Sequence, residues 1–130
     1  ALQSGSEWTA ELAFLGATQM PLITAPFPQY VVYYVAGASA AAGMPQDAEI
    51  DCFDGAGNRA GAIYFYPASG RLPKNQSTAN GIYLYFRIAR FSDVMTMLKY
   101  EKPLYLALNT DTDAGYIGTS NEPTGEQEGP

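Results

Sequence analysis

Alternation of tyrosine with aliphatic residues is the feature that most constrains how this chain can fold. In residues 81–89 every second side chain is apolar, namely Ile82, Leu84, Phe86 and Ile88. The positions between them carry Tyr83, Tyr85 and Arg87. Successive side chains of a β-strand point to opposite faces of its sheet. The pattern therefore predicts a strand with one core face and one amphipathic aromatic face.

The same division recurs in two other segments. Ile63 and Phe65 alternate with tyrosines in residues 63–66, and three leucines alternate with a tyrosine in residues 104–108. A tyrosine ring offers a large apolar area, while its hydroxyl still needs a polar partner. Such a face packs under a second layer, meets another subunit or holds a ligand. The predicted ligand or interface residues are Tyr64, Tyr66, Tyr83, Tyr85, Arg87 and Tyr105.

Length and turn signals predict a single globular domain over residues 1–120, followed by an acidic flexible tail over 121–130. The predicted strands are 8–15, 30–36, 49–54, 61–66, 81–89, 104–109 and 115–119. Between the third and fourth, residues 55–58 predict a hairpin turn. Segment 20–28 holds three prolines, which favour an extended loop or a sheet edge, and segment 67–80 predicts an exposed loop.

One helix is predicted near residues 92–101, with Ser92 as its N-cap and Pro103 ending the segment. Short strands separated by turns, with a single helix, predict a mainly β (α+β) fold. We expect a compact, curved antiparallel sheet of six or seven strands, forming a barrel or a sandwich. Residues 30–36 are nearly continuous in Val and Tyr, which predicts burial on both sides. The predicted core is Leu12, Phe14, Val32, Ile50, Phe53, Ile63, Phe65, Ile82, Leu84, Phe86, Ile88, Val94, Leu98, Leu104, Leu106 and Ile117.

Charge and composition exclude several classes of partner. The chain has 13 acidic and 7 basic residues, giving a net charge of -6, which disfavours nucleic acid. No apolar run reaches the roughly 18 residues of a membrane-spanning helix, so we expect a soluble protein and no membrane partner. The sequence does not separate a cytoplasmic from an exported location. The single cysteine, Cys52, stands among acidic residues, which predicts a buried and inert thiol.

Histidine is absent from the sequence, which excludes serine and cysteine triads and every metal centre built on imidazole. Paired carboxylates could still support glycoside hydrolysis. The candidates are Glu49, Asp51, Asp54 and Glu101. These acids fall at predicted turns and element ends, where solvated carboxylates are common. The sequence therefore favours a protein that is not an enzyme, and it predicts no cofactor.

Two loop motifs resemble ligand sites only in part. Asn109, Asp111 and Asp113 alternate like the first ligands of an EF-hand, but the glycine comes one residue late and Ser120 stands where a glutamate is needed. An ordinary turn is favoured, with Asp111 and Asp113 as weak metal candidates. The glycines of residues 55–61 precede an extended aromatic segment rather than a helix, which favours a turn over nucleotide binding.

The run 99–103, followed by a strand and then by residues 122–126, resembles the ends of short bacterial proteins; it covers less than a quarter of the chain and implies no activity.

Three functional hypotheses remain. The favoured one is a noncatalytic interaction protein that self-associates or binds a partner through its tyrosine-rich sheet face. The second is a module that binds a sugar or a cationic small molecule in an aromatic pocket. A carboxylate-dependent hydrolase is third. For Arg87, pairing with an acid such as Glu101 is favoured over binding a ligand.

Overall fold

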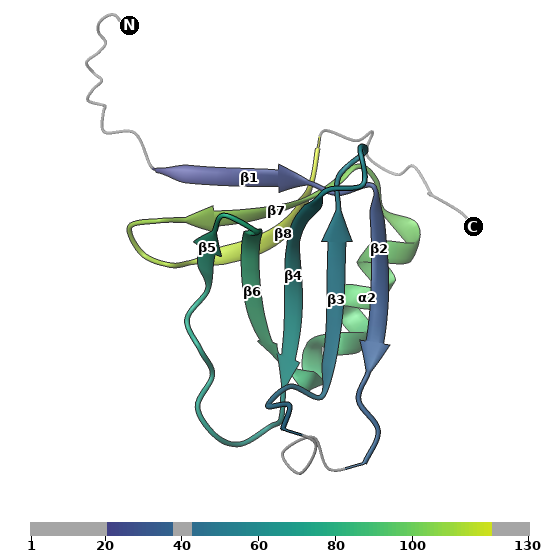
Figure 1. The fold of residues 1–130 in the computed structure, drawn as a ribbon, viewed down its shortest axis with the longest axis vertical. Helices are drawn as coiled ribbons and strands as arrows, with labels where there is room; N and C mark the ends of the chain where they lie inside the picture. Colours follow the sequence, from purple (N-terminus) through teal and green to yellow (C-terminus); the bar gives the residue numbers. More distant parts are fainter. Residues whose placement is uncertain (1–20, 38–42, 121–130) are drawn as a thin grey trace, which may run out of the picture.

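The computed structural model describes residues 21–37 and 43–120, and it shows two β-sheets and one α-helix (Figure 1). The first sheet has five strands in the order β2 (Gln29–Tyr34), β3 (Ala48–Phe53), β4 (Arg59–Tyr66), β6 (Gly81–Arg87) and β5 (Gln76–Thr78). The second has three, in the order β1 (Leu22–Pro26), β7 (Leu104–Asn109) and β8 (Gly115–Thr119). A 3-10 turn, η1 (Ile88–Arg90), leads into the helix α2 (Phe91–Tyr100). The predicted mainly β class is confirmed.

Strand pairing is antiparallel throughout the described sheets except between β4 and β6, which run parallel. A parallel pair cannot be joined by a tight turn and needs a long connection. Residues 67–80 provide it, and they include the short edge strand β5. The segment predicted to be only a loop therefore contributes a strand of three residues. The two sheets are open and do not close into a barrel (Figure 1).

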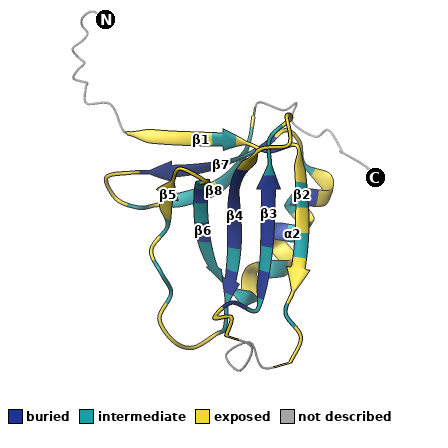
Figure 2. Cartoon of the chain, in the orientation of Figure 1, coloured by how far each residue is buried: buried dark blue, intermediate teal, exposed yellow. Residues whose placement is uncertain are grey.

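The core lies between the five-stranded sheet on one side and α2 with the three-stranded sheet on the other (Figures 1 and 2). Nine predicted core residues are buried: Ile50, Ile63, Phe65, Ile82, Leu84, Val94, Leu98, Leu104 and Leu106. Four more pack against them while half-buried: Val32, Phe86, Ile88 and Ile117. Phe53 lies outside this cluster, whereas Phe27, Cys52 and Leu108 belong to it. The thiol of Cys52 is buried, and burial raises its pKa to about 12, as expected of an inert cysteine.

Two predictions about individual elements are wrong. The strand predicted to be buried on both sides is β2, and it forms an edge of the five-stranded sheet, with Tyr33 51% and Tyr34 68% exposed. Ser92 is not the N-cap, because Arg90 takes that position without a side-chain cap. Helical geometry already begins in η1, and a capping serine needs an extended backbone. Ser92 therefore lies inside the first turn of α2.

Gly61 lies at a close approach between β4 and β6. It adopts φ 154° and lies opposite Ile82 in the parallel pair. A Cβ at this position would overlap the backbone oxygen of Ile82 and come within 2.8 Å of the side chain of Leu106. Only glycine fits where a strand approaches its neighbour this closely.

The predicted strand 8–15, with its core residues Leu12 and Phe14, and the predicted tail 121–130 lie outside the described residues. Within the described part of the chain, no helix is long and apolar enough to cross a membrane.

Candidate functional site: the tyrosine face

Four of the predicted tyrosines form one cluster on the outer side of the five-stranded sheet, which we call the tyrosine face: Tyr64, Tyr66, Tyr83 and Tyr85. Parallel pairing of β4 with β6 sets Tyr64 beside Tyr85, and their rings stack with centroids 5.3 Å apart. Tyr83 and Tyr66 add edge-on contacts at 6.0 and 5.8 Å, respectively. Stacked and edge-on ring pairs at such distances are favourable.

The tyrosine face is turned away from the core. Ile82 and Leu84, which alternate with Tyr83 and Tyr85, are buried on the opposite side. Helix α2 lies behind the sheet in Figure 1 and packs on the core, so it covers the sheet face opposite the four tyrosines. Each of the four tyrosines is half-buried by its neighbours rather than covered by a described layer.

An ionic cluster borders the tyrosine face on β3. Glu49 and Asp51 alternate with the buried Ile50 and Cys52, so their side chains share the outer side. The Arg59 guanidinium lies 3.1 Å from the Asp51 carboxylate and 3.9 Å from that of Glu49. Its guanidinium carbon also lies 5.9 Å from the ring centroid of Tyr83, a cation–π distance. The cluster therefore links β3 to the aromatic rings of β6.

The Glu49 carboxyl has an unusual acidity. Burial, followed by a hydrogen bond with Asp51 and the charge of that residue, raises the pKa of Glu49 from 4.5 to about 7, although Gln46 and Arg59 act in the opposite direction. The Gln46 side-chain amide donates a hydrogen bond to Glu49 Oε1 at 3.1 Å. Burial and the charge of Glu49 also raise the pKa of Tyr64 to about 12. The tyrosine hydroxyl is therefore a neutral hydrogen-bonding group at physiological pH.

This acidity has a measurable consequence for stability. The folded protein keeps a proton on Glu49 up to about pH 7, whereas the unfolded chain loses it near pH 4.5. The folded state therefore binds more protons in that window, and stability falls as the pH rises through it. In Glu49→Gln, the side-chain amide can donate to Asp51 as the protonated Glu49 carboxyl does, and the amide keeps its hydrogens at every pH. We expect this variant to melt a few degrees above the parent at about pH 8 and close to it at about pH 5.

The matched control is Asp111→Asn, which removes a carboxylate from an exposed turn. Thermal melts followed by circular dichroism at both pH values give the comparison. If the melting temperature changes equally with pH in the parent and in Glu49→Gln, Glu49 is ionised in the folded protein.

Arg87 stabilises a loop. It follows Tyr83 and Tyr85 on the same face of β6, opposite Tyr66. Its guanidinium donates to the backbone oxygens of Pro67 and Gly70 at 2.8 and 2.7 Å. The expected pairing with an acid is replaced by these bonds, because the chain turns back beside β6 at residues 67–70 and brings its carbonyl groups within reach. Arg87 thus fixes the start of the crossover connection.

Tyr105 is not part of the tyrosine face. It lies on β7 in the three-stranded sheet, where its ring covers Gly118 and meets Tyr116 edge-on at 6.2 Å. A hydrogen bond with Tyr105 raises the pKa of Tyr116. The sequence pattern identified the strand face correctly, but it could not tell to which sheet that strand belongs.

The other acidic residues considered as catalytic or metal-binding candidates lie in separate parts of the fold. Asp54 accepts hydrogen bonds from the backbone amides of Ala56 and Asn58 in the β3–β4 turn, while Glu101 follows α2. Asp111 and Asp113 lie in the β7–β8 turn, where the Asn109 side chain accepts the backbone amide of Asp111. The described residues contain no group of three or more acidic or cysteine side chains that could hold a metal ion.

Sequence reasoning does not predict the role of Glu49 and Asp51, because it places them as solvated acids at an element end. Both lie within β3, and Asp51 is only 7% exposed. Their alternation with Ile50 and Cys52 was the available signal, since it placed them on the outer face. Arg59 had no comparable signal, because its partners depend on the register of the hairpin.

Two cavities lie near these elements, and the tyrosine face lines neither of them. One, of about 300 Å³, is lined by Tyr33, Val35, Met44, Glu49 and Asp51. The other, of about 740 Å³, lies at the C-terminal end of α2. The tyrosine face therefore lies apart from both cavities.

Comparison of the chain with protein-family models, with curated proteins and with solved structures found no match.

Proposed function

We propose that this chain is a noncatalytic interaction protein that self-associates through the tyrosine face. The observation that carries the proposal is the contiguous set of four tyrosines on the side of the sheet that α2 does not cover. Tyrosine is enriched at interfaces because it buries a large area and its hydroxyl keeps a polar partner.

A second copy is the favoured partner because the surface is self-complementary in charge. Arg59 contributes a positive group beside Tyr83, and Asp51 contributes a carboxylate one strand away. A twofold contact uses the same patch on both subunits, so a patch that holds both charge signs does not repel its own copy. Tyrosine hydroxyls between them provide neutral donors and acceptors.

Sedimentation equilibrium over a range of protein concentrations tests self-association. We expect an apparent mass that rises above the 14.0 kDa of one chain as the concentration increases. The burial of the tyrosines should also reduce their access to a neutral fluorescence quencher over the same range. A mass of one chain at every concentration, with unchanged quenching, would contradict the proposal.

A second candidate, binding of a small cationic ligand, is favoured by the 300 Å³ cavity beside Glu49. Tyr33 and two acidic side chains line it, which is the combination that attracts an organic cation. A sugar has less support, because Tyr64 and Tyr85 stack on each other and Arg59 lies over Tyr83. Titration with tetramethylammonium, followed by tyrosine fluorescence, separates this candidate from self-association, since a saturable change at constant mass supports the ligand.

Glycoside hydrolysis is not supported by the carboxylate geometry. The Arg59 guanidinium contacts both carboxyl groups of the Glu49 and Asp51 pair, at 3.9 and 3.1 Å. Hydrolases hold their two carboxyl groups roughly 5 Å or more apart, leaving room for the anomeric carbon or a water molecule. In the Glu49 and Asp51 pair, the Arg59 guanidinium takes up contacts of both carboxyl groups that a substrate would need.

A further inference from the structure

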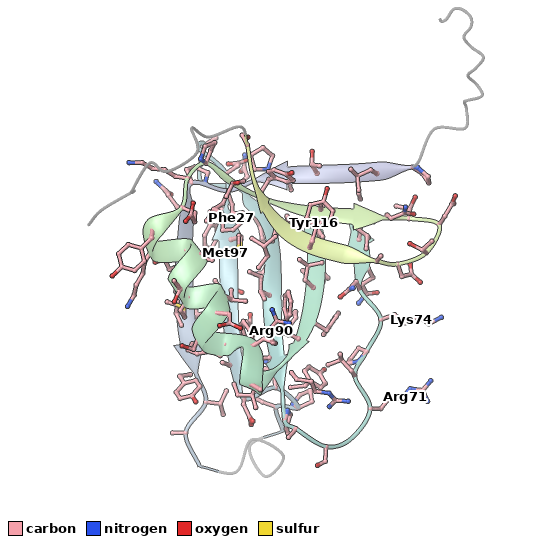
Figure 3. All side chains as sticks on the ribbon, turned by 180° about the vertical axis from the view of Figure 1, so that it is seen from behind. Phe27, Arg71, Lys74, Arg90, Met97 and Tyr116 are labelled. Carbon is pink, nitrogen blue, oxygen red and sulfur yellow. The ribbon has the colours of Figure 1, made fainter. Side chains whose placement is uncertain are left out.

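The cavity of about 740 Å³ lies between the segment joining β1 to β2 and the C-terminal end of α2. Its volume falls within the roughly 300–1,000 Å³ typical of sites for small molecules. Figure 3 labels Phe27 and Met97, which mark this part of the fold. None of the four residues of the tyrosine face lines this cavity.

Apolar side chains form the floor of the cavity. Phe27, Leu98 and Leu104 line it, and they are only 3%, 7% and 7% exposed. The backbone amide of Phe27 donates to the carbonyl of Leu104 at 3.1 Å, which ties two walls together. The floor is therefore built from fixed core residues and is formed before any ligand arrives.

The rim of the cavity is cationic. Lys99 and Lys102 line it together with a single acid, Glu101, so ammonium groups outnumber carboxylates. Among the described residues, neither lysine has an ion-pair partner. The chain has only 7 basic residues and a net charge of -6, so two cations with no ion-pair partner in the described part of the chain form a local reversal of charge on this apolar cavity.

Helix α2 ends at this rim, and the negative end of a helix dipole opposes an anion. Two features offset that effect. The amide of Glu101 donates to the carbonyl of Met97 at 2.9 Å, and Lys99 stands in the last turn. An anionic group would therefore be held by the lysine ammonium groups, while the remaining ligand atoms contact the apolar floor.

We propose that this cavity binds a small apolar carboxylate, whose ring or chain packs on Phe27, Leu98 and Leu104 while Lys99 and Lys102 hold its carboxylate. A purely apolar ligand would gain nothing from the two exposed ammonium groups, and a cationic ligand would be repelled by them. The site is separate from the tyrosine face and does not depend on self-association.

The test is a titration of the full chain with 2-naphthoate, followed by amide proton–nitrogen NMR spectra. We expect saturable shifts confined to the cavity, including the amides of Gly55, Lys99 and Leu104. The cationic analogue 2-naphthylmethylammonium should produce no saturable shift. The double variant Lys99→Met and Lys102→Met keeps the apolar stems and should weaken naphthoate binding by about tenfold or more.

The matched control is the double variant Arg71→Met and Lys74→Met, which removes the same two charges. Figure 3 shows both side chains on the connection before β5, far from Phe27 in that view. We expect this control to bind naphthoate as tightly as the parent does.

Three results would overturn the proposal. The amine could bind as tightly as the acid, or the Lys99 and Lys102 variant could keep full affinity. Alternatively, naphthoate could bind the full chain only after Glu122, Glu126 and Glu128 are replaced with Gln. This last result would mean that the lysines of the rim pair with the acidic C-terminal residues of the chain itself rather than with a ligand.

Discussion

Gly61→Ala is expected to leave little folded protein at physiological temperature. The added Cβ would overlap the backbone oxygen of Ile82, and alanine rarely adopts φ 154°. Because the clash is with a backbone atom of the neighbouring strand, relief requires moving β4 away from β6. We expect a loss of about 4 kcal/mol or more, out of a total stability of roughly 5–15 kcal/mol. Thermal melting should show a fall of more than about 10 °C.

Two glycines of the neighbouring turn provide graded controls. Gly57 has φ 87° with open space around its Cβ position, so Gly57→Ala should cost only about 1 kcal/mol. Gly55 has open space and no positive φ, and Gly55→Ala should be nearly neutral. If Gly61→Ala melts like Gly57→Ala, the close approach of β4 to β6 is incorrect.

Replacing Tyr83 and Tyr85 together with Ser is expected to abolish self-association while the fold survives. Both rings lie on the outer side of β6, so their removal leaves the core unchanged. Loss of an aromatic anchor typically costs about 2 kcal/mol or more of binding energy, which is more than tenfold per residue. The lost ring contacts within the sheet should cost only about 1 kcal/mol or less per pair. Sedimentation should then give the mass of one chain at every concentration.

The control for this variant replaces Tyr100 and Tyr116 with Ser, since both are more than 40% exposed and lie outside the tyrosine face. It should assemble like the parent. A Tyr83 and Tyr85 variant that is unfolded by circular dichroism would mean that these rings form a second core. A folded variant with unchanged mass and unchanged ligand binding would identify the tyrosine face as ordinary solvated surface.

Alternation in the sequence was enough to predict which side of each inner strand faces the core. Ile82 and Leu84 are buried, and Tyr83 and Tyr85 lie on the reverse side, because this relation holds for any strand whatever its neighbours. The turn between β3 and β4 was also predictable, since glycines cluster between two apolar segments.

Features that depend on distant pairing could not be predicted from local patterns. Val and Tyr in β2 suggested burial, but an edge strand with the same residues leaves Tyr33 and Tyr34 exposed. The parallel pairing of β4 with β6 arises from a crossover that contains β5, which has only three residues. The sequence pattern groups Tyr105 with the other tyrosines because alternation carries no information on sheet membership.

The place of β1 in the smaller sheet has a consequence for synthesis of the protein on the ribosome. Its described hydrogen-bonded neighbour is β7, with Leu22 opposite Asn109, so the two partners leave the ribosome far apart in time. Pairings between such distant segments slow folding and leave strands unprotected in the nascent chain. While β2 to β6 are being synthesised, Leu22 and Ile23 of β1 lack their partner strand β7. The three-stranded sheet can therefore assemble only after α2 has been translated, and nascent chains stalled before Leu104 should be the ones that chaperones recognise.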